Sequence, residues 1–179
     1  MQQTKAVKAS REWKKASIVK DFEGSAIERI SKEWMLVTAG DKDNYNTMTA
    51  SWGGVGYLWE RAVVFAFVRP SRYTYEFMEK SDRFTLTFFD KSLKAKVHKI
   101  CGSESGRDID KPKATGITPI HFDDDTISFK EASAVIICKK LYFDDFKPAN
   151  FLDREIEKFY QQQNYHRIYV GEVERFYKK

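Results

Sequence analysis

The segment that most restricts the fold of this chain is an apolar run over residues 62–68, Ala-Val-Val-Phe-Ala-Phe-Val, which lies between Arg61 and Arg69. Successive side chains of a strand point to opposite faces, so a run that is apolar at every position needs cover on both faces. The run is far shorter than the roughly 20 apolar residues of a membrane-spanning helix. It therefore predicts a strand covered on both sides, in a barrel wall or beneath a helix.

Strand patterns recur on both sides of this run and alternate with short helical patterns. Residues 35–39 and 47–52 flank a turn-forming Gly-Asp-Lys-Asp-Asn sequence and predict a hairpin, which Gly53-Gly54 would end or bend. We expect further strands at 83–89, 126–129, 134–143 and 165–176, strand character from residue 26, helices at 73–80, 91–100 and 153–162, and a loop at 103–119. Six or seven strands with short helices between them favour a mainly β antiparallel barrel over a parallel sheet.

Charge separates the first 20 residues from the rest of the chain. The 179 residues include 31 Lys and Arg and 26 Asp and Glu, and residues 1–20 hold six of the basic residues but only one of the acidic ones. Residues 21–179 are therefore balanced, which argues against a nucleic-acid partner, because such an interface needs Lys and Arg concentrated on the folded face. We expect residues 1–20 to be a basic arm, in which the loosely helical pattern of residues 5–15 suggests an exposed, weakly ordered segment or a short peripheral helix, and residues 21–179 to be a single domain.

The sequence lacks the signatures of several common sites. It contains no GxGxxG after a strand, no P-loop and no HExxH or GxSxG motif, and His98, His121 and His166 are not at metal-ligand spacing. We expect no metal site, and structural or solvated roles for these histidines. The first residues are charged rather than apolar, and Cys101 and Cys138 are the only cysteines, so we expect a cytoplasmic protein that is not associated with a membrane.

One arrangement suggests a site for an anion. The 46–52 segment is rich in hydroxyl groups, and the sequence Arg69-Pro70-Ser71-Arg72-Tyr73-Thr74 places two guanidinium groups and two hydroxyls at the start of a predicted helix. Helix N-termini attract anions, and Arg can bind a phosphate in bidentate fashion. A purely structural interpretation remains open, in which Ser71 caps the helix and Arg69 and Arg72 are surface charges.

Five segments, in this order, resemble successive motifs of the flavin reductase-like proteins, in particular the flavoredoxin branch. They are Asn-Thr-Met-Thr-Ala-Ser-Trp-Gly-Gly at 46–54, Phe-Val-Arg-Pro-Ser-Arg-Tyr-Thr at 67–74, Phe-Thr-Leu-Thr-Phe-Phe at 84–89, Cys-Gly-Ser-Glu-Ser-Gly-Arg-Asp-Ile-Asp-Lys at 101–111 and His-Arg-Ile-Tyr-Val-Gly-Glu-Val at 166–173. The resemblance covers roughly residues 26–175.

The resemblance implies an FMN-binding split barrel, a six-stranded antiparallel Greek-key barrel that forms a homodimer with FMN near the subunit interface. Lys111 is the candidate for a positive charge near the reducible part of the ring. The resemblance assigns no catalytic residue. The implied cofactor-binding residues are Asn46, Thr47, Met48, Thr49, Ala50, Ser51 and Trp52 along the ring and ribityl chain, Arg69, Ser71, Arg72 and Thr74 at the phosphate, Phe88 and Phe89 beside the flavin, and Ser103, Ser105 and Lys111 in a closing loop.

Two functions within this class stay open. The chain could be a reductase that takes a hydride from NAD(P)H, or an electron carrier that keeps its FMN bound and exchanges electrons with a redox partner protein or a small-molecule acceptor. The alternative from another class is a barrel that binds single-stranded nucleic acid through its aromatic residues, without a flavin.

Overall fold

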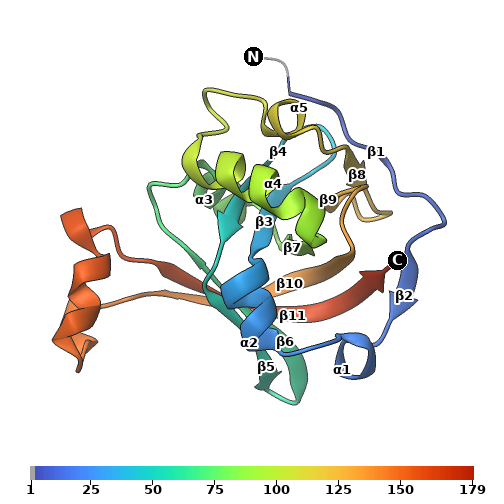
Figure 1. The fold of residues 1–179 in the computed structure, drawn as a ribbon. Coiled ribbons are helices and arrows are strands. Elements are labelled where there is room, and N and C mark those ends of the chain that lie inside the picture. The colour runs from blue at the N-terminus through green and yellow to red at the C-terminus, as the bar shows by residue number, and fades with distance from the viewer. Residues whose placement is uncertain (1–2) are drawn as a thin grey trace.

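The computed structural model describes residues 3–179 and has a mainly β, antiparallel architecture (Figure 1). The strands are β1 (Val7–Lys8), β2 (Lys14–Ala16), β3 (Met35–Gly40), β4 (Tyr45–Ala50), β5 (Gly53–Leu58), β6 (Arg61–Val68), β7 (Arg83–Phe88), β8 (Pro119–His121), β9 (Ile127–Phe129), β10 (Ala134–Asp145) and β11 (Arg167–Lys178). The helical elements are α1 (Ile18–Asp21), α2 (Ala26–Glu28), η1 (Arg29–Glu33), α3 (Tyr73–Lys80), α4 (Lys91–Ser103), α5 (Lys111–Thr115), η2 (Pro148–Asn150), η3 (Arg154–Phe159) and η4 (Gln161–Gln163).

The main sheet runs in the order β4-β3-β7-β10-β11-β6-β5, and β2 pairs additionally with β11. All of these pairings are antiparallel. The split-barrel fold is thus confirmed, although this path has seven strands rather than six. Within the described residues the path ends at β5 without pairing back to β4, so the barrel is not closed by hydrogen bonds.

The apolar run forms β6, as predicted, and lies between β5 and β11. Val63, Val64, Ala66 and Val68 are buried, but Phe67 is only half-buried. The second face of the strand is therefore less covered than the sequence predicts, because Phe67 lines a cavity there.

Two apolar cores lie on opposite faces of the β3–β7 part of the sheet. Alternation along β3 sends Val37 into one core and Leu36 into the other, and alternation around the end of β7 does the same with Phe88 and Phe89. Helix α3 packs against β3 and β4, and α4 packs against β4. The helices predicted at 73–80 and 91–100 are confirmed, the second continuing to Ser103.

Several sequence predictions are wrong in detail. Residues 5–15 of the arm are not helical: β1 pairs with β8, β2 pairs with β11, and Trp13 is buried at 8% exposure, so the arm is packed onto the body. Residues 26–33 form α2 and η1 rather than a strand, and Gly53-Gly54 begin β5. The helix predicted at 153–162 consists of the short 3-10 turns η3 and η4, and the predicted loop at 103–119 contains α5.

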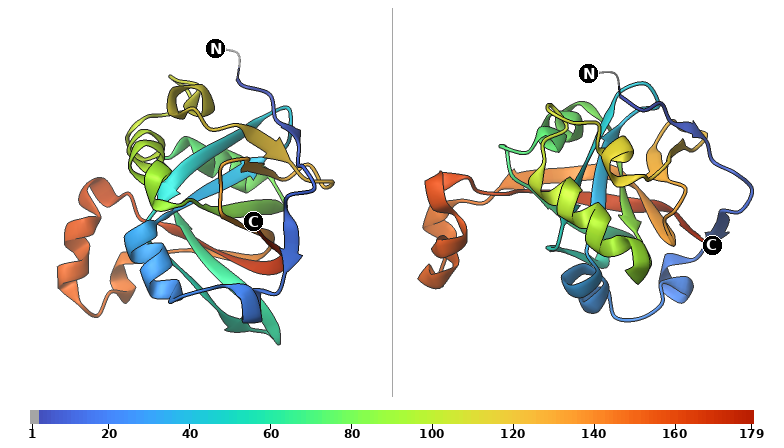
Figure 2. Two further views of the ribbon diagram at one scale, coloured as in Figure 1. Left: turned by 45° about the vertical axis from the view of Figure 1, so that its right-hand side comes forward. Right: turned by 45° about the horizontal axis from the view of Figure 1, so that its top comes forward.

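Residues 146–166 connect β10 to β11 and form a segment that extends away from the body in both views of Figure 2. We call it the outer segment. Its own aromatic rings pack together, with Tyr160 stacked on Tyr165 at 4.9 Å between centroids and on Phe151 at 5.6 Å. The outer segment therefore has a small apolar centre of its own, separate from the cores of the body.

Candidate functional site

Two neighbouring cavities lie where β4 ends and α3 begins, and Met48 and Arg72 line both of them. The strand cavity, of about 230 Å³, is lined by Met48, Thr49, Ala50, Ser51, Trp52, Phe67, Arg69, Arg72 and His166. The loop cavity, of about 70 Å³, is lined by Met48, Ser71, Arg72, Tyr73, Thr74, Ser103, Glu104, Ser105 and Lys111. Twelve of the residues singled out in the sequence thus meet at one place: Met48, Thr49, Ala50, Ser51, Trp52, Arg69, Ser71, Arg72, Thr74, Ser103, Ser105 and Lys111.

Four of the singled-out residues are placed elsewhere. Phe88 is fully buried in the barrel core and Phe89 is 4% exposed beneath α4, so neither ring reaches these cavities. The Asn46 amide donates to the Thr74 hydroxyl at 2.8 Å, and the Thr47 hydroxyl pairs with that of Thr38. Asn46 and Thr47 therefore support the cavity walls, and Thr47 contributes its carbonyl rather than its side chain.

Lys111 and Arg72 place positive charge at the loop cavity. The buried Lys111 ammonium donates to the carbonyls of Thr47 at 2.8 Å and Cys101 at 3.2 Å, and burial lowers its pKa to about 8. The Arg72 guanidinium donates to the Gly102 carbonyl at 2.6 Å, and burial, followed by the nearby Arg69, lowers its pKa. Within residues 3–179 neither cation has a carboxylate within ion-pair distance, so this positive charge has no direct counterion.

The outer wall of the strand cavity is held by a relay of hydrogen bonds through His166. Arg69 Nε donates to His166 Nε2 at 3.3 Å, so the imidazole proton must lie on Nδ1, which then donates to the Tyr160 hydroxyl at 3.1 Å. Burial and the Arg69 charge lower the pKa of His166 to about 4, which keeps the ring neutral. The Trp52 ring lies 5.2 Å from the His166 ring and edge-on to Phe159.

Arg69 consequently has a different position from the one predicted. Its second contact is a 2.8 Å hydrogen bond to the Phe159 carbonyl, and it lines the strand cavity but not the loop cavity. Its guanidinium ties the outer segment to the body and does not pair with Arg72 around a single anion.

Ser71 lines the loop cavity but does not cap the helix, so the structural alternative for this residue is wrong. Arg72 occupies the cap position of α3, and the exposed Ser71 hydroxyl accepts a 2.6 Å hydrogen bond from the Asn164 amide. Ser71 is thus a second contact between the body and the outer segment.

Sequence reasoning missed His166 as part of this site. The signal exists only in the strand register: Arg167 pairs with Val68, which places residue 166 beside residue 69 across the ladder. A register between strands about 100 residues apart cannot be derived from periodicity alone.

The chemistry of the two cavities differs in a way that suits one extended ligand. The strand cavity offers aromatic and apolar walls beside a strand, which suits a planar ring with polar edges. The loop cavity offers hydroxyls and two cations, which suits a phosphate. Among residues 3–179 no cluster of three His, Cys, Asp or Glu side chains could hold a metal ion, and no described helix is long and apolar enough to cross a membrane.

Comparison with known proteins agrees with this geometry. The profile of the flavin reductase like domain family matches residues 27–179. A search of curated proteins found no match. The fold resembles that of a flavoredoxin from Methanosarcina acetivorans (TM-score 0.64, 20% identity, 82% of this chain and 68% of that chain). It also resembles an FMN-binding domain of a flavin reductases-like enzyme from Shewanella baltica OS155 (TM-score 0.67, 18% identity, 93% of this chain and 76% of that chain). A further similar structure is the flavoredoxin of Desulfovibrio vulgaris (Miyazaki F) (TM-score 0.63, 19% identity, 82% of this chain and 69% of that chain).

Proposed function

Because the chain belongs to the flavin reductase like domain family, which supports a flavin-related redox role, we propose that it binds FMN as a tightly held redox cofactor. The observation that carries this proposal is a pair of cations that face the loop cavity with carbonyl partners only, of which Lys111 is buried and Arg72 is partly buried. Burying uncompensated positive charge is costly, and an anionic ligand would offset that cost.

The residues present fit FMN. The ring would lie in the strand cavity beside Met48 to Trp52, and the phosphate would lie in the loop cavity near Arg72, Ser105 and Lys111. Lys111 lines the loop cavity and not the strand cavity, so this proposal places it at the phosphate rather than beside the ring, where the sequence predicted it. When bound, FMN supplies hydride or single-electron transfer. The chain itself contributes orientation through the strand backbone, positive potential from the two cations, and partial exclusion of water by Trp52 and Phe159, whose rings are 41% and 47% exposed.

The electron donor defines the activity within this proposal. Trp52 at the strand cavity is half-exposed, so the cavity is open to a donor from solvent, and we include NAD(P)H as a candidate donor alongside a redox partner protein. Anaerobic stopped-flow mixing with NADH and with NADPH separates the two. Rapid bleaching of the flavin by either nucleotide identifies a reductase, and bleaching only by a ferredoxin-like donor identifies a carrier.

We also propose a homodimer. Three exposed aromatic residues, Tyr57, Trp59 and Tyr142, lie near the β5–β6 turn and in the far part of β10, and the rings of Trp59 and Tyr142 are 6.3 Å apart. Exposed aromatic patches are typical of protein interfaces. Sedimentation should give twice the mass of one chain, and a monomer at micromolar concentration would refute this part of the proposal.

The main test is direct. The purified protein should be yellow or should bind added FMN, and Arg72→Ala should weaken FMN binding by about 2 kcal/mol, roughly thirtyfold, because a hydrogen bond to a charged group is lost. Arg11→Ala is the matched control, since Arg11 is exposed and lines neither cavity. A colourless protein that does not bind FMN would refute the proposal, and binding of a single-stranded oligonucleotide instead would favour a nucleic-acid-binding barrel.

A further inference from the structure

The first described residues of the chain cross over the loop that carries Lys111. Thr4 donates to the Asp110 carboxylate twice, from its backbone N–H at 2.7 Å and from its hydroxyl at 2.6 Å. The Tyr45 hydroxyl donates to the Thr4 carbonyl at 2.8 Å, and the Gln3 amide donates to the Tyr45 carbonyl at 2.5 Å. We call residues 3–8 the strap, because β1 then pairs with β8 and continues the attachment.

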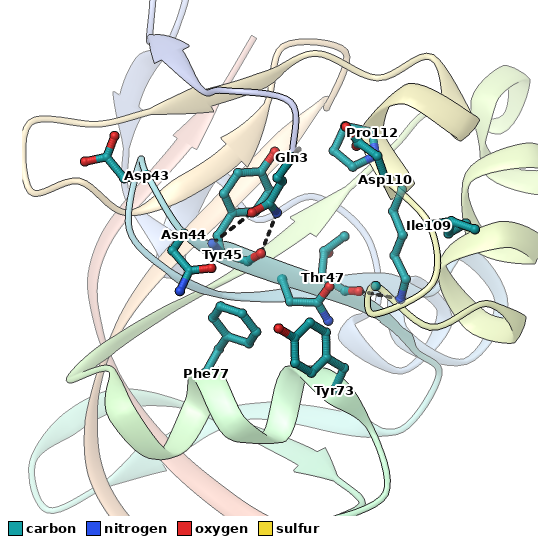
Figure 3. Close-up of a pocket in the computed structure, with 13 residues that line it drawn as sticks. Gln3, Asp43, Asn44, Tyr45, Thr47, Tyr73, Phe77, Ile109, Asp110 and Pro112 are labelled. Carbon is teal, nitrogen blue, oxygen red and sulfur yellow. Dashed lines mark hydrogen bonds between the residues drawn. The ribbon is translucent and has the colours of Figure 1, made fainter. Parts of the chain in front are cut away.

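The strap closes one side of a third cavity, of about 250 Å³, between β4, α3 and the loop (Figure 3). In Figure 3, Gln3 lies against Tyr45 on one side of this cavity, and Asp110 and Pro112 lie across from them. Lys111 lines both this cavity and the loop cavity. The ammonium group of Lys111 is therefore at a wall between the strap and the proposed phosphate site.

Asp110 connects the strap to Lys111. One carboxylate oxygen of Asp110 accepts both bonds from Thr4, while the other accepts from the Lys113 N–H and caps α5. Lys111 is the first residue of α5, so its backbone position is fixed by that cap. The preceding loop residue Gly106 packs directly on Asn46 of β4, which leaves the loop little freedom to adjust.

We propose that Thr4 and Asp110 are positioning residues for the cofactor site: the strap holds the loop closed and keeps the Lys111 ammonium at the loop cavity, so that FMN affinity depends on a contact made by the N-terminal residues. This inference rests on the proposed binding of FMN. It gives residues 3–8 a role in the site, although the sequence places them in a basic arm outside the family resemblance.

The pH dependence of FMN affinity reports on this positioning. The charged and titratable groups that face Lys111 are Arg72 before α3, Cys101 and Glu104 at the end of α4, and Asp110 beside it. The pKa of Lys111 is about 8 in the closed loop. FMN phosphate favours the protonated amine, so wild-type affinity should fall above pH 8, by up to about thirtyfold at pH 9.5, since each pH unit above the pKa costs tenfold. A freed and solvated Lys111 would return toward its usual pKa, and the affinity would stay level over this range.

The experiment measures FMN affinity from pH 7 to 9.5 for the full chain, Asp110→Asn and Thr4→Val, with Asp108→Asn as the matched control. Asn still caps a helix, and Thr4→Val removes a hydrogen bond without changing any charge. We expect Asp110→Asn to weaken binding about tenfold at pH 7.5 and Thr4→Val about threefold, from the loss of charge-assisted hydrogen bonds. Both should flatten the pH profile, whereas Asp108→Asn, an exposed change in the same loop, should match wild type.

Three results would overturn the inference. In the first, both variants keep the FMN affinity and the pH profile of the wild type. In the second, the variants lose FMN affinity by the same factor at every pH, which a merely structural role would produce. A flattened profile in Asp110→Asn but not in Thr4→Val would also refute it, because the Asp110 charge would then act without the strap. Competitive acetylation of Lys111 in the FMN-free chain gives the pKa of its amine directly. If wild type fails to bind FMN, the proposed function fails, while the acetylation still decides whether the strap holds Lys111.

Discussion

Gly106→Ala tests whether the loop really packs against β4 at the proposed site. A Cβ at residue 106 would overlap the Asn46 amide oxygen and would lie 3.0 Å from Asn46 Cγ and 3.3 Å from the Tyr73 ring. Ordinary contacts begin near 3.4 Å, so either the Asn46 amide or the loop must move by more than about an ångström. Asn46 cannot move freely, because its amide donates to the buried Thr74 hydroxyl.

The expected loss in the free energy of unfolding has two parts, the overpacking at residue 106 and the loss of the Asn46–Thr74 hydrogen bond. Overpacking of this kind costs about 1–3 kcal/mol, and an unpaired buried hydroxyl costs about 1–3 kcal/mol more if Asn46 is displaced. We expect the free energy of unfolding to fall by about 2–4 kcal/mol and the melting temperature by roughly 6–12 °C. FMN affinity should fall as well, because Ser105 and Lys111 flank the displaced position.

Urea and thermal unfolding of the FMN-free protein measure the first effect, and an FMN titration measures the second. Gly102→Ala is the matched control: it lies in α4, its Cβ would meet only ordinary contacts near 3.5 Å, and it should be neutral or stabilising. Asn46→Ala removes the clashing group, so adding Gly106→Ala to it should cost under about 1 kcal/mol. Additive losses in the double variant, or wild-type stability of Gly106→Ala alone, would refute the reasoning.

Three further predictions concern other parts of the molecule. Arg69→Gln removes the hydrogen bonds to His166 and to the Phe159 carbonyl, so limited proteolysis should cut the outer segment faster while the melting temperature of the body changes little. An unchanged cutting rate would show that Arg69 does not hold the outer segment to the body. Burial lowers the pKa of both His98 and His166 to about 4, below the unfolded value of 6.5. The unfolded chain therefore binds more protons in this range, and the free energy of unfolding should fall as the pH drops from 6.5 to 4. Urea unfolding at several pH values should show this slope, and replacing both residues with Gln should flatten it. Trp13→Ala should cost about 3 kcal/mol because the ring is buried, whereas Arg11→Ala, an exposed change in the same arm, should be neutral in the same unfolding assay.

The sequence alone identified the strands with clear period-2 or continuous apolar patterns, because burial of such runs depends mainly on local alternation. Strand β6 and helix α3 are examples. The two strands in the arm could not be predicted from the sequence, because they are only two and three residues long and pair with strands more than 100 positions away. A charged segment carries no local signal for such pairing.

The candidate site divides in the same way. Residues adjacent in sequence, such as Met48 to Trp52, could be grouped from a motif, and the structure places them on one cavity. His166 could not be grouped with them, since its place depends on the register of β11 against β6. The motif predicts Phe88 and Phe89 beside the flavin, but alternation at the end of β7 sends the two rings into two separate cores.

The position of β11 has a consequence for how this chain is made. Strand β11 lies between β10 and β6 and also carries β2, so it joins parts of the sheet that are synthesised at very different times. Ala16 pairs with Phe176 about 160 residues later, and such distant pairing makes folding slow. During translation the first strands must wait on the ribosome without their partner, and the wall that His166 gives to the strand cavity is added only after β3 to β10 have emerged. Cofactor loading should therefore follow the synthesis of β11 rather than guide the folding of the strands before it.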